Sequence, residues 1–280
     1  MDKSNITFVI FTFNEEARIE NVIKNFKNFG KILIADNKST DRTIEIANQY
    51  GCDVYTRQKH YNYVENQELV DLLYKEISTD WIYWGFADEM LELDALKKIS
   101  EIISENKYDI INVDRKNYYY GDFCYDVYTS RTNKIFKKGA LDFTENQIHG
   151  HGKATVPYEK IHILDDKYFV HHFISNNASS YLNVLNRYSD SEEILPNAKY
   201  SYTFFYSILF FAKHLVLNFF CKKGKKTGYS AIALIQLMIF YNIFKIMKIY
   251  EKHKGLNPRT IEDKNNFARK SIIESIENYG

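Results

Sequence analysis

The chain has 280 residues, and its 37 Lys and Arg side chains nearly balance its 36 Asp and Glu side chains. The net charge of +1 argues against a nucleic-acid-binding protein with a broad basic surface. Hydrophobic residues form 45% of the chain, which excludes a disordered protein and allows one large or two small packed domains. The three cysteines, Cys52, Cys124 and Cys221, are far apart, which argues against a disulfide framework or a cysteine zinc site and suits a reducing compartment.

Strands and helices are predicted to alternate along the first half of the chain. Short apolar runs predict strands at 6–12, 32–35, 52–56, 81–84 and 110–113. Apolar residues at helical spacing predict helices between these strands, at 19–29, 39–50, 69–77 and 94–105. This alternation predicts an α/β fold, with a mostly parallel sheet flanked by helices.

Polar side chains close three of the predicted strands, and in a parallel sheet these carboxyl ends form the ligand-binding edge. They are Thr12, Asn14 and Glu15 after the first strand, Asp36 after the second, and Asp88 and Glu89 after the fourth. Neither a Gly-x-Gly-x-x-Gly fingerprint nor a Walker-type lysine loop occurs, which disfavours a dinucleotide dehydrogenase or a P-loop NTPase.

Carboxylates gathered at one edge suit a nucleotide-activated sugar, whose diphosphate must be neutralised when it leaves. A divalent cation, Mg²⁺ or Mn²⁺, held by one or two carboxylates performs this task. Asp88, with Glu89 beside it, is the candidate for the metal site, whereas Asp36, Asn14 and Glu15 are candidates for nucleoside contacts. The acceptor hydroxyl needs a carboxylate base.

Three separate segments carry a family resemblance. They read Phe-Val-Ile-Phe-Thr-Phe-Asn-Glu-Glu at 8–16, Ile-Ala-Asp-Asn-Lys-Ser-Thr-Asp-Arg-Thr at 34–43 and Asp-Trp-Ile-Tyr-Trp-Gly-Phe-Ala-Asp-Glu at 80–89. In order and spacing they resemble the family 2 glycosyltransferases with a GT-A fold, and within these the lipopolysaccharide-core glucosyltransferase subgroup. Weaker similarity at 131–137, 148–149 and 171–172 extends the resemblance to residues 5–255.

The resemblance implies a metal-dependent, inverting transfer from a nucleotide-sugar, with a UDP-sugar favoured, to a lipopolysaccharide-like or lipid-linked surface glycan. By position, it implies nucleoside contacts for Thr12, Asn14, Glu15 and Asp36, a phosphate contact for Arg131, and metal ligation by Asp88 and His172. The catalytic candidates are Glu145, Glu89 and His149. An ordinary ion pair at Arg131 and purely structural roles for Asp36 and the histidines are the alternatives.

Two positions depart from the family pattern. Phe86 stands where the family has the first Asp of Asp-Ala-Asp-Glu, and Gly150 stands where the subgroup has Glu after Val-His. Glu145, five residues upstream of Gly150, is therefore the candidate substitute base. A non-catalytic binding or assembly module with the same fold is the alternative function. A nucleotidyltransferase is disfavoured, because no Gly-, Arg- and Lys-rich loop follows the first strand.

Two apolar stretches, 203–221 and 229–247, flank the basic cluster Lys222-Lys223-Gly224-Lys225-Lys226. Charged residues inside both stretches argue against simple spanning helices, whereas the basic cluster suits anionic headgroups. We expect a helical hairpin in the inner-leaflet interface of a cytoplasmic, peripheral protein; packing on the catalytic domain or homo-oligomerisation are alternatives.

The predicted domains are 1–175 for nucleotide-sugar binding and catalysis, 176–257 for the helical extension and 258–280 for a polar tail, as a short helix or mobile segment.

Overall fold

The computed structural model describes residues 5–57, 65–146, 150–191 and 204–277. Its first half alternates strands and helices, as the apolar pattern predicts. The elements are β1 (Ile6–Thr12), α1 (Ile19–Phe26), β2 (Lys31–Asp36), α2 (Thr43–Gln49), β3 (Asp53–Thr56), α3 (Gln67–Glu76), β4 (Trp81–Phe86), β5 (Glu89–Leu91) and α4 (Leu93–Glu105). The predicted strand at 110–113 is the start of a ten-residue strand, β6 (Ile110–Tyr119).

The remaining strands complete one mixed sheet and a small separate one. They are β7 (Asp122–Phe123), β8 (Ser130–Lys137), β9 (Leu141–Asp142), β10 (Lys153–Ala154), β11 (Ile161–Ile163) and β12 (Phe169–Ile174). The main sheet runs β3-β2-β1-β4-β8-β6-β12-β5, with β7 and β11 paired to β6. The first four strands in this order are mutually parallel. Strand β8 is antiparallel to both β4 and β6, so the predicted fifth strand is not the neighbour of β4.

Alternation along the central strands divides the core into two layers, because successive strand side chains point to opposite faces. On β1, Phe8 and Ile10 pack on the side of α1 and α4. Val9 and Phe11 pack on the opposite side, against α3. All four side chains are at most 5% exposed, so β1 is covered on both of its faces.

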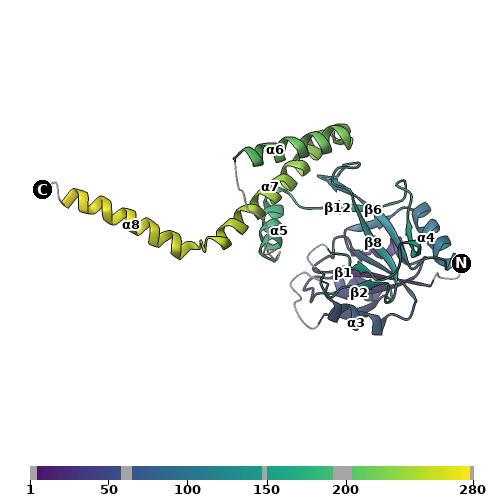
Figure 1. Ribbon diagram of the computed structural model, residues 1–280. Coiled ribbons are helices and arrows are strands. Elements are labelled where there is room, and N and C mark those ends of the chain that lie inside the picture. Colours follow the sequence, from purple (N-terminus) through teal and green to yellow (C-terminus); the bar gives the residue numbers. More distant parts are fainter. Residues whose placement is uncertain (1–4, 58–64, 147–149, 192–203, 278–280) are drawn as a thin grey trace.

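The C-terminal third is helical, with α5 (Ala178–Ser191), α6 (Phe204–Leu215), the short helical segments η2 (Val216–Cys221) and η3 (Gly224–Lys226), α7 (Tyr229–His253) and α8 (Pro258–Glu277). Helices α5 and α6 contact α7, and α8 projects away from the other elements (Figure 1). The start of α7 buries Ala231, Leu234 and Ile235 against Tyr119 and Val127 of the sheet region. The tail is thus a 20-residue helix, longer than the short segment expected.

Among the described residues, α7 is the one helix long and apolar enough to cross a bilayer. A third of its most apolar window is buried inside the protein, which is also a property of core helices. Length and composition therefore do not distinguish a spanning helix from one that packs on the sheet.

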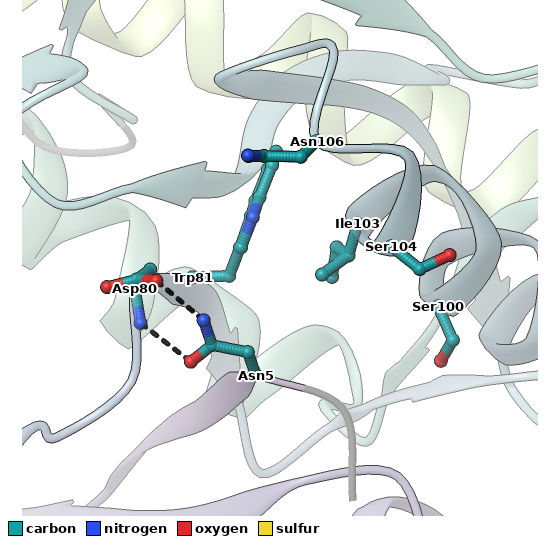
Figure 2. Close-up of a pocket in the computed structure, with 7 residues that line it drawn as sticks. All are labelled: Asn5, Asp80, Trp81, Ser100, Ile103, Ser104 and Asn106. Atoms are coloured by element: carbon teal, nitrogen blue, oxygen red, sulfur yellow. Dashed lines mark hydrogen bonds between the residues drawn. The ribbon is translucent and has the colours of Figure 1, made fainter.

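A cavity of about 290 Å³ lies at the amino ends of β1 and β4, where Asn5 precedes β1 and Trp81 begins β4. Figure 2 shows Asn5 and Asp80 joined side by side, with Ser100, Ile103 and Ser104 of α4 opposite. Asn5 Nδ2 donates to Asp80 Oδ2 at 2.6 Å, and Asp80 N donates to Asn5 Oδ1 at 3.0 Å. Because ligands of such sheets bind at the carboxyl ends of the strands, this cavity lies at the opposite ends of β1 and β4 from the expected ligand-binding edge.

Candidate functional site

Asp36, the last residue of β2, is fully buried beside Thr12, the last residue of β1. Thr12 Oγ1 donates to Asp36 Oδ1 at 2.8 Å, and Ser39 donates to the same oxygen through Oγ at 2.5 Å. Ser39 N donates to Asp36 Oδ2 at 2.8 Å. Three hydrogen-bond donors satisfy the buried Asp36 carboxylate, so this side chain stabilises the turn that follows β2. Its assignment, with Thr12, as a nucleoside contact stays a prediction.

The loop after β1 is joined to the loop after β2 by hydrogen bonds. Asn14 N donates to Ser39 Oγ at 2.8 Å, and Thr40 N donates to Asn14 Oδ1 at 2.8 Å. Glu15 N donates to Thr43 Oγ1 at 2.7 Å. Asn14 has a positive φ of 56°, a conformation that Asn adopts more readily than most residues. The two loops therefore form one rigid rim, on which Asn14 is exposed and Glu15 half-buried.

Asp88 follows β4, in the turn that leads into β5, and its side chain is 29% exposed. Its Oδ2 lies 3.4 Å from His172 Nε2. The other ring nitrogen, Nδ1, lies 2.8 Å from Asn117 Oδ1. An amide oxygen only accepts, so Nδ1 carries the proton and Nε2 presents its lone pair, or a second proton, to Asp88. Pairing of β12 with β5 and β6 thus brings together three residues that are distant in sequence.

Burial alone would raise the pKa of Asp88, but neighbouring side chains outweigh it and lower the pKa to about 2. His172 has the largest lowering effect, followed by Arg18 and Arg115. In contrast, burial raises the pKa of Glu15, although Arg18 opposes this shift. Asp88 is therefore an anion at neutral pH, at an edge of the sheet where cations gather.

Glu89, next to Asp88, is fully buried and faces the interior. Its Oε2 lies 2.5 Å from Lys134 Nζ, which is also fully buried, and accepts from Phe86 N at 3.2 Å. Arg115 Nη1 lies 3.5 Å from Oε1. Burial lowers the pKa of Lys134, while Glu89 opposes this shift. In this conformation Glu89 holds the turn that carries Asp88, and a substrate hydroxyl has no access to it.

The remaining predicted site residues are Arg131, Glu145 and His149, and His171 stands next to His172 in the chain. Arg131 forms a bidentate ion pair with Asp114 across β6 and β8, at 2.7 and 2.9 Å, with its side chain 46% exposed. The phosphate contact predicted for Arg131 has no support in these contacts and stays a prediction. Glu145 is exposed after β9. His149 lies outside the described residues. His171 projects to the opposite face of β12 from His172, where its Nδ1 lies 3.0 Å from Tyr118 Oη.

A divalent cation can be tested against the donors at this edge. Asp88 offers a partly exposed carboxylate, and His172 offers an imidazole that Asn117 orients from behind, as metal-bound histidines are usually held. Oxygen and imidazole donors suit Mn²⁺. No cluster of three or more His, Cys, Asp or Glu side chains with metal-site geometry occurs in the described parts of the chain. The site fits a cation that the donor's phosphates and water also ligate.

Three residues of this site do not follow from the polar ends of the predicted strands. Asn117 lies within β6, Lys134 lies in the apolar second half of β8, and Arg18 precedes α1. None of them stands at the carboxyl end of a predicted strand, so this signal does not find them. Lys134 does belong to the segment 131–137 that resembles the family, and it contacts Glu89 beside Asp88 directly.

The parallel strands with polar carboxyl ends, the antiparallel β8 beside β4 and the helical C-terminal region define a GT-A-like fold. The family model described as "Glycosyl transferase family 2" matches residues 7–165, more than half of the chain. The chain belongs to glycosyl transferase family 2.

Curated relatives include an uncharacterized glycosyltransferase of Rickettsia bellii, 32% identical over 105 residues, and one of Rickettsia typhi, 33% identical over 104 residues. Each match covers 37% of this chain and 34% of the relative, so the chain spans about a third of the length of these relatives.

Similar solved structures include two proteins in complex with nucleotide-sugars. Staphylococcus aureus TarS in complex with UDP-GlcNAc is 14% identical, with a TM-score of 0.46, over 76% of this chain and 66% of that one. Glucosyl-3-phosphoglycerate synthase from Mycobacterium tuberculosis, in complex with Mn²⁺, UDP-glucose and phosphoglyceric acid, is 22% identical, with a TM-score of 0.30, over 42% of this chain and 45% of that one.

Proposed function

We propose that the protein transfers a sugar, with inversion, from a nucleotide-sugar to a glycan acceptor at the edge that carries Asp88. The observation that carries this proposal is the partly exposed Asp88 carboxylate, oriented toward His172 and supported from below by the buried Glu89–Lys134 pair. Membership of glycosyl transferase family 2 makes glycosyl transfer the reaction that suits these groups.

Asp88 and His172 would hold a divalent cation, Mn²⁺ or Mg²⁺, which when bound offsets the negative charge of the donor's diphosphate. The proposed reaction forms a bond between an acceptor oxygen and the anomeric carbon and breaks the bond from that carbon to the diphosphate. The electron pair of the broken bond leaves on the diphosphate, and the acceptor proton passes to a carboxylate base. Glu145 is our candidate for this base, because it is exposed whereas Glu89 is closed to substrate.

We further propose that the donor is a UDP-sugar and that the acceptor is lipid-linked or lipopolysaccharide-like. Both proposals are supported by the resemblance of the segments 8–16, 34–43 and 80–89 to the lipopolysaccharide-core glucosyltransferase subgroup.

A test compares the wild type with Asp88→Ala and Asp53→Ala, an exposed carboxylate at the amino end of β3. Isothermal titration with UDP and Mn²⁺, together with hydrolysis of a panel of nucleotide-sugars, should show binding and turnover that Asp88→Ala abolishes and Asp53→Ala leaves unchanged. Glu145→Gln should lose turnover but keep UDP binding. A folded wild type that binds no nucleoside diphosphate would contradict the proposal and favour a non-catalytic module.

A membrane surface is the location that we propose for this reaction, at the inner face of the cytoplasmic membrane. Segments α6 and η2 and the middle of α7 expose apolar side chains, namely Ile208, Leu209, Phe211, Val216, Phe220 and Phe240. The exposed cations Lys213, Lys223, Lys225 and Lys226 lie on or between the same segments. Apolar side chains flanked by lysines suit an anionic lipid surface, where each Lys contributes about 1 kcal/mol. The buried start of α7 favours an interfacial over a spanning position.

Flotation with vesicles of phosphatidylcholine, with or without phosphatidylglycerol, tests this location. The wild type should float with the anionic vesicles. Reversing Lys225 and Lys226 to Glu should weaken this binding at least about 10-fold. The matched control reverses Lys264 and Lys270 on the distant α8, both exposed, and should change binding less. Equal losses in the two double variants would mean that only net charge matters and would contradict a docking face on α6 to α7.

A further inference from the structure

Arg18 spans from the loop after β1 to the end of β12, beside Asp88. Its Nε donates to the Glu15 carboxylate, and its Nη1 donates to Ser175 Oγ at 3.2 Å. Ser175 directly follows β12, and Phe173 N, two residues earlier, donates to the carbonyl oxygen of Asp88 at 2.8 Å. The guanidinium is thus held at both sides, next to the strand end that carries the candidate metal ligands.

The Arg18 side chain is also partly exposed to solvent. Its side chain is 35% exposed, compared with 19% for Glu15 and 29% for Asp88. Its second terminal nitrogen, Nη2, has no hydrogen-bond partner among the described residues. The Arg18 charge lowers the pKa of Asp88, and the Asp88 charge raises that of Glu15, so the three groups are close enough to interact.

The charges around Asp88 leave a role for this cation. The carboxylates Glu15, Asp88 and Glu89 are balanced by Arg18, Arg115 and Lys134. A divalent cation would balance the diphosphate of an intact nucleotide-sugar. When the sugar leaves, the diphosphate gains a further negative charge, and a guanidinium with an open donor is the side chain best suited to bind it.

We propose that Arg18 is a diphosphate-binding residue, which contacts the donor's phosphate oxygens through its exposed guanidinium edge. This assignment rests on the proposed function and adds a residue to the same site. Glu15 and Ser175 fix the plane of the guanidinium, so little side-chain freedom is lost on binding. Arg131, for which the resemblance implies a phosphate contact, pairs with Asp114, and its phosphate contact stays a prediction.

The test compares UDP with uridine, which has the same nucleoside but no phosphate. Dissociation constants are measured by titration calorimetry for UDP and by ligand-observed NMR for uridine, with Mn²⁺ present, for the wild type, Arg18→Gln, Arg18→Lys and Arg42→Gln. Arg42 is the matched control, because it is 64% exposed, pairs with Glu45 on the surface and removes the same charge when changed. Circular dichroism confirms that each variant is folded.

Arg18→Gln should weaken UDP binding at least about 10-fold and leave uridine binding unchanged, since a charge-assisted hydrogen bond is lost. Arg18→Lys should show an intermediate loss, and Arg42→Gln none. If Arg18→Gln weakens uridine as much as UDP, the residue only holds the loops together and the assignment is wrong. Unchanged UDP affinity in Arg18→Gln overturns it as well. A wild type that binds neither ligand contradicts the proposed function itself, which distinguishes the two failures.

Discussion

The parallel strands β2 and β4 each have an aspartate at or just after their carboxyl ends, and the two side chains differ in exposure. At the end of β2, Asp36 is fully buried and accepts hydrogen bonds from Thr12 and Ser39. After β4, Asp88 is partly exposed and faces His172. The same rule of parallel sheets placed both residues at the ligand-binding edge. The comparison teaches that this rule locates a carboxylate but does not say whether the carboxylate is free to bind.

The largest effect is expected beneath the Asp88 turn. Lys134→Met leaves Glu89 as a buried charge with only the more distant Arg115, which should destabilise the protein by about 3–5 kcal/mol. The double variant Lys134→Met with Glu89→Gln removes both charges and should recover most of this loss. Urea unfolding of both variants and the wild type provides the measurement. A single variant as stable as the wild type would mean that the pair does not support the turn.

The contrast between the two aspartates predicts unequal losses of stability. Asp36→Ala leaves the Ser39 amide and the Thr12 hydroxyl without an acceptor in a buried place, at a cost of about 2–3 kcal/mol. Asp88→Ala removes a partly exposed contact and should cost less than about 1 kcal/mol. Thermal unfolding of the two variants measures the difference. Equal destabilisation by the two substitutions would mean that Asp88 contributes as much to folding stability as Asp36 does.

Asn117 lies behind the partner of Asp88, because its Oδ1 is 2.8 Å from His172 Nδ1. Asn117→Leu removes the acceptor that orients His172, and we expect Mn²⁺ affinity to fall about 10–100-fold. Asn117→Asp keeps an acceptor oxygen and should retain most of the affinity. Titration of Mn²⁺ followed by electron paramagnetic resonance gives the constants. Unchanged Mn²⁺ affinity in Asn117→Leu would remove His172 from the proposed ligands.

The smallest effect is expected at Arg131. Its ion pair with Asp114 is well aligned but nearly half-exposed, so Arg131→Gln should cost no more than about 1 kcal/mol. UDP affinity should stay within twofold, about 0.4 kcal/mol, of the wild-type value if the guanidinium binds only Asp114. Unfolding and titration of the same variant measure both quantities. A large loss of UDP affinity would instead support the phosphate contact that the sequence predicts for Arg131.

Local patterns predicted the first four strands and the helices between them, because apolar periodicity reports burial directly. The three motifs also indicated the family, which the match over residues 7–165 establishes. The structure differs from these predictions where strands that are distant in sequence pair with each other. Strand β8 lies between β4 and β6 although it follows both in the chain, and nothing in an apolar run specifies its neighbour. The helix Pro258–Glu277 likewise exceeds the short tail expected from a polar segment.

The sequence by itself determined which side chains stand at the carboxyl ends of the strands, because strand ends follow from the order of apolar and polar residues. Only the tertiary structure decided which of them are open. It buried Asp36 under Thr12 and Ser39, closed Glu89 with Lys134, and brought His172, Asn117 and Arg18 toward Asp88. Exposure and charge partners depend on contacts between residues up to 157 positions apart, as between Arg18 and Ser175, and such contacts exist only after the sheet has assembled.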